Sequence, residues 1–323
     1  MNTLKILITG GSGFIGTNAI DFFRTKGFEI LNLDIKPPQN HLHEQFWSQC
    51  DILDLNTYKK LSLEFNPDYF LHLAARTDLQ GKTDLSEYAA NIEGVQNTVE
   101  VVNSCPRIQR TIFASSRMVC RIDYQPRDFD DYCPPNLYGE SKMIGEKIVK
   151  KSRINGEWLM IRPTSIWGPW FDVPYKIFFT TIKHRRYFNP GDHNPSKSFG
   201  YVGNTVWQLD KLLFTKTEMV NQKIFYLCDY PPLQLRTWAE LIRKEMKIKP
   251  IPTIPYFVLK GMALIGDGLS FAGWYRVPLT SFRLNNLITN MVYDTQDLEK
   301  ICGNLPFTLE EGVSKTVKFM NLN

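Results

Sequence analysis

A glycine-rich turn between an apolar strand and a helix constrains the fold of this chain most. Residues 4–8 (LKILI) form a buried-strand pattern, residues 9–16 read TGGSGFIG, and a helix pattern follows to about residue 26. Glycine lets the backbone turn tightly and lets a pyrophosphate approach the amides, while the helix N-terminus adds partial positive charge. We therefore predict a dinucleotide-binding turn formed by Gly10, Gly13, Phe14, Ile15 and Gly16.

Further strand patterns alternate with helical patterns over the first half of the chain. The strands are expected at residues 29–34, 69–75, 110–115 and 157–162, and helices at 55–65 and 91–104. This alternation predicts an α/β protein with a Rossmann-type, doubly wound parallel sheet and right-handed crossovers.

The composition of the sequence changes after Pro163, where prolines and aromatic residues become frequent. We expect residues 1–163 to form the dinucleotide-binding domain and residues 164–323 to form mainly a smaller substrate-binding lobe. One segment near residues 223–228 is expected to cross back to the sheet.

Composition excludes several classes of protein. The 38 Lys and Arg residues exceed the 33 Asp and Glu residues by only five, and no basic block suggests a nucleic-acid polymer as partner. The six cysteines have no close metal-type spacing and are typical of reduced, cytoplasmic thiols. His41 and His43 lie in a polar loop with no third ligand nearby, so no metal is expected.

One apolar stretch, residues 254–274, is interrupted by Lys260 and Asp267. These charges argue against an integral membrane segment. An amphipathic helix that lines a lid or a dimer face is the expectation, and contact with a membrane surface is the alternative.

Two acidic residues after the glycine turn indicate the cofactor. Asp34 ends the second strand, where a carboxylate hydrogen-bonds the adenosine ribose and repels the 2′-phosphate of NADP, so we predict NAD. Asp51, followed by Ile52, is a candidate adenine contact.

A tyrosine and a lysine four residues apart predict the catalytic centre. Tyr138 and Lys142 share one face of a helix that follows the strand carrying Ser115 and Ser116. A tyrosine titrates near 10, so a base at neutral pH needs nearby positive charge from Lys142 and the nicotinamide. Lys142 would also hold the nicotinamide ribose, and Ser116 would donate to the substrate oxygen.

Together these motifs resemble the extended short-chain dehydrogenases, which include the NAD-dependent nucleotide-sugar epimerases and dehydratases. The resemblance covers about residues 4–206, and returns weakly over residues 293–312. It implies a Rossmann domain, a lobe that holds a nucleoside-diphosphate sugar, and further cofactor contacts from Leu73, Ala74, Ala75, Asn91 and Pro163.

The chain departs from the family pattern at several positions. Arg117-Met118 replaces the Asp-Glu pair of the dehydratases, which disfavours dehydration. Cys120-Arg121 stands where many members have Tyr-Gly, and Gly203-Asn204 stands where many have an acidic pair. Ser165 occupies the place of a substrate-binding asparagine.

Candidate substrate residues are therefore few. Ser165 is retained as one, and arginine suits a diphosphate, so Arg236 and Arg283 are candidates, with Lys197 as a third cation. A structural salt bridge is the alternative role for either arginine.

The combined pattern predicts an NAD-dependent epimerase of a nucleoside-diphosphate sugar, a homodimer in the cytoplasm. It would oxidise the sugar transiently and return the hydride to the opposite face. A nucleotide-sugar or other carbonyl reductase, including steroid oxidoreductases of the same fold, is the first alternative. A non-catalytic dinucleotide-sensing protein is the second, although a sensor needs no general base.

Overall fold

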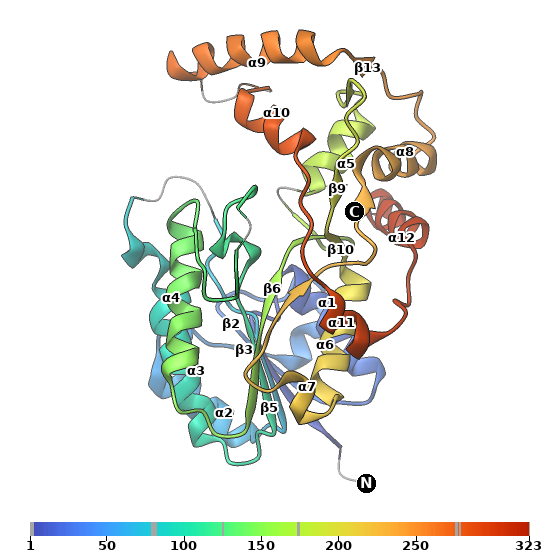
Figure 1. The fold of residues 1–323 in the computed structure, drawn as a ribbon. Helices are drawn as coiled ribbons and strands as arrows, with labels where there is room; N and C mark the ends of the chain where they lie inside the picture. Colours follow the sequence, from blue (N-terminus) through green and yellow to red (C-terminus); the bar gives the residue numbers. More distant parts are fainter. Residues whose placement is uncertain are drawn as a thin grey trace.

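A seven-stranded parallel sheet carries the first half of the chain, and a second lobe stands above the carboxyl ends of its strands (Figure 1). The computed structural model describes residues 3–78, 83–124, 126–172, 175–274, 277 and 279–322. The strands of the sheet, in chain order, are β1 (Lys5–Thr9), β2 (Glu29–Asp34), β3 (Trp47–Gln49), β4 (Tyr69–His72), β5 (Arg110–Ala114), β6 (Glu157–Pro163) and β11 (Ile224–Leu227).

The order of the strands across the sheet is β11-β6-β5-β4-β1-β2-β3, and every pairing is parallel. The order reverses between β1 and β4, which places a ligand crevice at their carboxyl ends. The strands are nearly continuous runs of buried residues, as expected for a sheet covered on both faces. The Rossmann-type α/β prediction is confirmed.

Helices cover both faces of the sheet (Figure 1). On one side lie α2 (Leu55–Phe65), α3 (Ala89–Ser104) and α4 (Leu137–Lys151), and α3 packs against both neighbours. On the other side lie α1 (Phe14–Thr25) and α6 (Val202–Phe214), which pack together. Short 3₁₀ turns η1 (His41–Phe46), η2 (Leu85–Tyr88) and η3 (Arg117–Val119) connect these layers.

The second lobe consists of short strand pairs and helices. The strand pairs are β7 (Ser165–Trp167) with β10 (Phe199–Tyr201), β8 (Asn189–Pro190) with β13 (Thr253–Ile254), and β9 (Ser196–Lys197) with β12 (Leu233–Gln234). The helices of this lobe are α5 (Tyr175–Lys183), α8 (Leu235–Glu245), α9 (Tyr256–Phe271) and α10 (Ser281–Ile288).

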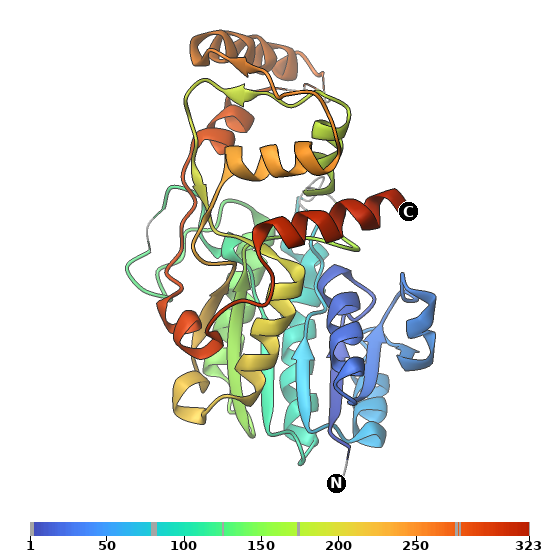
Figure 2. The ribbon, with the colours of Figure 1, turned by 90° about the vertical axis from the view of Figure 1, so that its right-hand side faces the viewer.

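Aromatic residues form a buried cluster in the second lobe. Trp167 is fully buried, and its ring centroid lies 5.3 Å from that of Trp238 and 5.2 Å from that of Tyr201. Helix α12 (Leu309–Leu322) crosses between the lobes and packs on α8 (Figure 2). A Cβ on Gly312 would lie 2.9 Å from the Trp167 ring, so α12 approaches this cluster closely.

The C-terminal half of the chain also contributes to the sheet layer. β11 pairs with β6, α7 (Thr217–Val220) precedes it, and α11 (Gln296–Cys302) packs against α6 and β11. No helix in the described ranges is long and apolar enough to cross a membrane.

Candidate active site

The glycine turn lies where β1 meets α1, at the reversal of strand order. Gly10 has φ of +73°, and a Cβ there would lie 2.6 Å from the amide nitrogen of Ala74. A Cβ on Gly16 would lie 2.4 Å from the Gly10 carbonyl oxygen, whereas one on Gly13 would meet only that oxygen, at 3.2 Å. The turn is thus packed tightly on the protein side and open beside Gly13.

The amides of the first turn of α1 face this opening. The intrahelical bonds of α1 begin with the Thr17 amide donating to the Gly13 carbonyl, at 2.8 Å. Phe14, Ile15 and Gly16 precede it, so their amides have no carbonyl one turn back within the helix. Gly13 caps the helix without a side-chain bond, and no acidic residue occupies the first turn. These features fit a bound pyrophosphate.

Asp34 lies beside the turn at the end of β2. Its carboxylate accepts hydrogen bonds from the amides of Ser12 (3.1 Å) and Lys36 (3.0 Å). Burial raises the pKa of Asp34 above its usual value, although both amide bonds act in the opposite direction. The carboxylate is therefore fixed next to the turn, at the place where a ribose diol would lie.

Ser116 and Tyr138 meet at the carboxyl end of β5. Tyr138 is in the first turn of α4, and its phenol lies close to the Ser116 side chain. The Ser116 hydroxyl accepts a bond from the Met118 amide, at 3.1 Å, which begins η3. Burial raises the pKa of Tyr138, while the Ser116 hydroxyl and the charge of Arg117 lower it.

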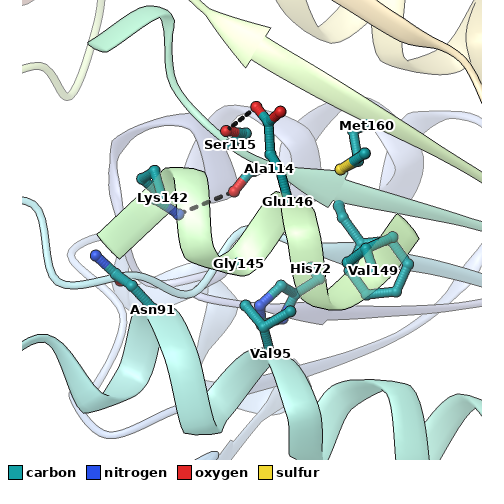
Figure 3. A pocket seen from close by; sticks show the side chains of 11 residues that line it. His72, Asn91, Val95, Ala114, Ser115, Lys142, Gly145, Glu146, Val149 and Met160 are labelled. Atoms are coloured by element: carbon teal, nitrogen blue, oxygen red, sulfur yellow. Dashed lines mark hydrogen bonds between the residues drawn. The ribbon is translucent and has the colours of Figure 1, made fainter. Parts of the chain in front are cut away.

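Lys142 lies one helical turn after Tyr138, deep in the protein. Its ammonium donates to the Ala114 carbonyl oxygen, at 2.9 Å, and only 4% of the residue is exposed (Figure 3). Burial lowers the pKa of Lys142 to about 8, and the Glu146 carboxylate acts in the opposite direction. The helix α4 thus places the phenol and the ammonium on one face, both next to the end of β5.

A small cavity of about 10 Å³ lies behind Lys142, with His72 and Glu146 among its lining residues (Figure 3). This volume admits about one water molecule. The His72 Nδ1 atom lies 2.9 Å from the Thr9 hydroxyl, while its buried Nε2 atom has no partner among the described residues. Burial lowers the pKa of His72 to about 3, so the imidazole is neutral.

Glu146 holds α4 in place through a buried network. The Arg162 guanidinium donates two bonds of 2.8 Å to the Glu146 carboxylate, and the hydroxyls of Ser115 and Tyr132 donate to the same group. Arg162 is on β6 and is fully buried. The helix that carries Tyr138 is therefore tied to the sheet below the site.

Asn91 ties the loop after β4 to α4. Its amide oxygen accepts from the Arg76 amide, and its amide nitrogen donates to the Arg76 carbonyl and the Ser141 hydroxyl, all within 3.0 Å. The side chain is buried and fully engaged with the protein. This arrangement positions the segment of Leu73, Ala74 and Ala75 beside Gly10. Direct contacts of this segment and of Asn91 with a cofactor stay predictions.

The other predicted cofactor residues lie in different surroundings. Asp51 is exposed and caps the Leu53 amide at 2.9 Å, whereas Ile52 is buried against Gly94. Pro163 ends β6, at the same edge of the sheet as Ser116. Their roles also stay predictions.

The predicted substrate residues are dispersed. Ser165 is buried and accepts a bond from the Tyr175 hydroxyl. Lys197 is buried, and its ammonium donates to the carbonyls of Asn286 and Thr289. Arg236 donates to the Gly191 carbonyl and Arg283 to the Val277 carbonyl, so both guanidinium groups have structural bonds within the second lobe.

The family model described as "NAD dependent epimerase/dehydratase family" matches residues 6–227, more than half of the chain. The chain belongs to this family. The resemblance inferred from the sequence motifs is thereby confirmed.

Relatives within the family act on sugars and on steroids. The chain is 24% identical to UDP-glucuronate 4-epimerase 4 of Arabidopsis thaliana, over 77% of this chain and 65% of the relative. It is 27% identical to a 3-beta-hydroxysteroid dehydrogenase of Mycolicibacterium neoaurum, over 62% of this chain and 58% of the relative. The alignments thus span about three fifths to two thirds of these relatives.

Solved structures share the fold over nearly the full length of this chain. The UDP-glucose 4-epimerase of Thermotoga maritima, crystallised with UDP-glucose, superposes with a TM-score of 0.73 at 17% identity, covering 99% of both chains. The Bordetella bronchiseptica enzyme WbmH, in complex with NAD+, gives a TM-score of 0.74 at 16% identity, again covering 99% of both.

The structure brings one further cation to this family member's site. Arg117 directly follows Ser116, its charge lowers the pKa of Tyr138, and it lies close enough to the Tyr293 hydroxyl to lower the pKa of that group as well. The ring of Tyr293 stacks on that of Tyr226, with centroids 4.4 Å apart. From the sequence, Arg117 served only as an argument against dehydration. Tyr293 lies far along the chain, so no local pattern connects the two residues.

The structure also explains the family departure at Gly203-Asn204. The Asn204 amide nitrogen donates to the Phe307 carbonyl, and its oxygen accepts from the Phe307 amide, each at 3.0 Å. A Cβ on Gly203 would lie 2.6 Å from the Tyr201 ring and 2.9 Å from the Phe307 ring. These residues therefore hold the segment that leads into α12.

Proposed function

We propose that this protein is an NAD-dependent epimerase of a nucleoside-diphosphate sugar. The observation that carries this proposal is the placement of Tyr138 beside Ser116, with Lys142 one turn further on, at the same edge of the sheet as the glycine turn and Asp34. Acid–base groups and a dinucleotide turn on one edge suit oxidation of a hydroxyl. The epimerases among the relatives and the solved structures add support.

Different residues of the chain would act on the substrate and bind the cofactor. The Tyr138 oxygen removes the proton from a sugar hydroxyl and later returns it, while the Ser116 hydroxyl donates to the same substrate oxygen. Lys142 holds the nicotinamide ribose, Asp34 the adenosine ribose, and the first-turn amides of α1 the pyrophosphate. Bound NAD would supply the acceptor and donor of the hydride.

The second lobe would bind the sugar nucleotide, with residues 1–163 as the cofactor domain and 164–323 as mainly the substrate lobe. Ser165 is a buried polar residue of that lobe. It begins β7, two residues after Pro163. We place the protein in the cytoplasm, where its six free cysteines fit a reducing environment. A homodimer is proposed from the resemblance, and light scattering after gel filtration would measure it.

A net dehydrogenase is the second candidate. The 3-beta-hydroxysteroid dehydrogenase of M. neoaurum aligns with 27% identity. A sterol-4-alpha-carboxylate 3-dehydrogenase of Candida albicans is 24% identical over 98% of this chain. The same Tyr138 chemistry, with release of the reduced cofactor, would serve such a reaction.

A labelled substrate separates the two candidates. The protein is incubated with UDP-, GDP-, CDP- and dTDP-sugars, and isomers are resolved by chromatography. With deuterium at the inverted carbon, an epimerase keeps the label in the product and releases no NADH. Stoichiometric formation or consumption of free NAD(P)H would overturn the epimerase proposal in favour of the dehydrogenase.

A single-atom change tests the general base. Tyr138→Phe should lower turnover by about three orders of magnitude or more while the protein stays folded and still binds NAD, because only the phenol oxygen is removed. Tyr256→Phe, on α9 in the second lobe, is the matched control and should leave turnover unchanged. Near-normal turnover of Tyr138→Phe would contradict the mechanism.

A further inference from the structure

Helix α9 exposes an unusual amount of apolar surface. Of its 16 residues, Leu259, Ala263 and Gly266 are buried, and the first two pack against Leu284 of α10. The large apolar side chains on α9 and directly after it that are at least 48% exposed are Phe257 (76% exposed), Met262 (48%), Leu264 (60%), Ile265 (67%), Phe271 (97%) and Trp274 (66%). Phe282 of the neighbouring α10 is 74% exposed.

This distribution is the reverse of an ordinary surface helix. A surface helix turns its apolar stripe to the core and its charged residues to water. In α9 the side toward the core is formed by Leu259 and two small residues, and a Cβ on Gly266 would lie 1.9 Å from the Leu279 carbonyl oxygen. Most of the bulky apolar residues therefore lie on the outer side, in a patch of the kind that marks an interaction site.

The position of α9 makes the whole helix available. It lies along the outer end of the second lobe, farthest from the parallel sheet, in both views of the ribbon (Figures 1 and 2). No described element covers its outer side in either view. A broad, flat surface could therefore contact α9 along its full length.

Exposed cations lie on segments next to the N-terminal end of α9. The residues after α5 reach it because β8 pairs with β13, directly before α9, and Phe188 packs on the Leu259 cluster. The exposed cations on these segments are Lys183, Arg185, Arg186, Lys247, Lys249 and Lys260.

The acidic side chains of the same region are fewer. They are Asp192, in the loop after β8, Glu245, at the end of α8, and Asp267, whose carboxylate already accepts a bond from the Ser281 amide. The region thus combines exposed apolar residues with an excess of cations.

We propose that α9 docks this protein on an anionic lipid bilayer, lying in the plane of the interface. An apolar helix flanked by Lys and Arg, with a tryptophan at its end, matches the physics of interfacial binding: apolar burial plus attraction to anionic headgroups. No helix in the described part of the chain can span a membrane, so the contact is peripheral. The proposal does not depend on the enzyme's substrate.

The charges argue against a second copy of the chain as the occupant. A two-fold contact places the same patch on both partners, so the cations around one α9 would face those around the other. Like charges brought together across an interface oppose association. An anionic bilayer removes this repulsion and is attracted by the same cations.

Vesicle co-sedimentation tests the proposal on the full chain. We expect binding to phosphatidylcholine vesicles that contain phosphatidylglycerol, much weaker binding to phosphatidylcholine alone, and loss of binding at high salt. Leu264→Glu/Ile265→Glu should lower the partition coefficient at least about tenfold. Arg185→Glu/Arg186→Glu should lower it by a similar factor, through charge.

A matched control variant separates docking through α9 from nonspecific adsorption of the protein to vesicles. Leu42→Glu/Leu63→Glu changes two exposed leucines of the Rossmann domain (63% and 43% exposed) and should bind vesicles like the wild type. All variants should keep the wild-type melting temperature, since the altered residues are exposed. No binding of the wild type, or equal loss in the control, would overturn the proposal. So would a wild-type dimer that dissociates in Leu264→Glu/Ile265→Glu without any vesicle binding.

Discussion

The guanidinium of Arg162 and the carboxylate of Glu146 form a buried pair with two hydrogen bonds of 2.8 Å, one helical turn beyond Lys142. The pair joins β6 to α4, so the helix that carries Tyr138 and Lys142 is fixed to the sheet. Ser115, the residue before Ser116, donates to the same carboxylate. The network therefore orients both components of the candidate catalytic centre without touching the substrate.

Breaking this pair should cost stability. Arg162→Met leaves the Glu146 carboxylate buried without its cation, and such a change typically costs about 3–5 kcal/mol. Urea unfolding should show a loss of this order. Asp297→Asn, which breaks an exposed pair with Lys300, should cost less than about 1 kcal/mol. Equal small losses would show that the buried network does not stabilise the fold.

Lys142 should give the protein a distinctive pH dependence of stability. Burial lowers its pKa to about 8 from an ordinary value of 10.5, so between these pH values the unfolded chain binds more protons than the folded one. Stability contributed by Lys142 therefore rises with pH through this window, by up to ~1.4 kcal/mol per pH unit.

A comparison of variants isolates that contribution. Lys142→Met should reduce the rise in the free energy of unfolding between pH 8 and pH 10, leaving the part that buried Lys197 contributes, whereas Lys151→Met, an exposed lysine at the end of the same helix, should retain the full rise. Chemical denaturation across this range measures the slopes. Identical slopes for both variants would show that Lys142 titrates normally in the folded protein. Lys142→Met should also weaken NAD binding.

Arg117 should set the pH at which the enzyme becomes active. Its charge lowers the pKa of Tyr138, against the rise that burial causes. Arg117→Gln should therefore move the rising limb of the pH–kcat profile to higher pH, by about 0.5–1 unit. Arg121→Gln, an exposed neighbour, is the control and should leave the profile in place. An unshifted limb in Arg117→Gln would contradict an electrostatic role.

Local signals account for what the sequence could predict. The turn at Gly10, the strand that ends at Asp34 and the helix that carries Tyr138 each depend on a short, continuous pattern, and the structure contains all three. The buried-strand patterns likewise predict the parallel sheet, because their apolar runs need helices on both faces.

Long-range partners account for what could not be predicted. Arg117 meets Tyr293 and Asn204 meets Phe307 only because the C-terminal segment folds back onto the sheet layer. The presence of an arginine or lysine in the sequence does not show which group the side chain binds. Arg236 and Lys197 are sequence candidates for phosphate binding, yet both donate to carbonyl oxygens of their own lobe. The sequence predicted a helix over residues 254–274 with an apolar face available for contact, but not which of its residues are exposed, because an apolar pattern does not say which side faces the core.

Asp34 should decide the choice of cofactor. Its carboxylate, fixed by the amides of Ser12 and Lys36, would repel the 2′-phosphate of NADP. Asp34→Asn should weaken NAD binding and strengthen NADP binding, changing the ratio of the two dissociation constants at least about tenfold. Calorimetric titration with both cofactors measures this ratio. Asp51→Asn, which leaves Asp34 intact, should affect both cofactors alike.

The same carboxylate gives this preference a pH dependence. Burial raises the pKa of Asp34, so the group becomes neutral at a higher pH than an ordinary aspartate as the solution is acidified. A neutral carboxyl no longer repels a phosphate, so the preference of the wild type for NAD over NADP should fall as pH drops through the acid range. Asp34→Asn should show no such change. A wild-type preference that is constant from neutral to acid pH would mean that Asp34 does not face the ribose.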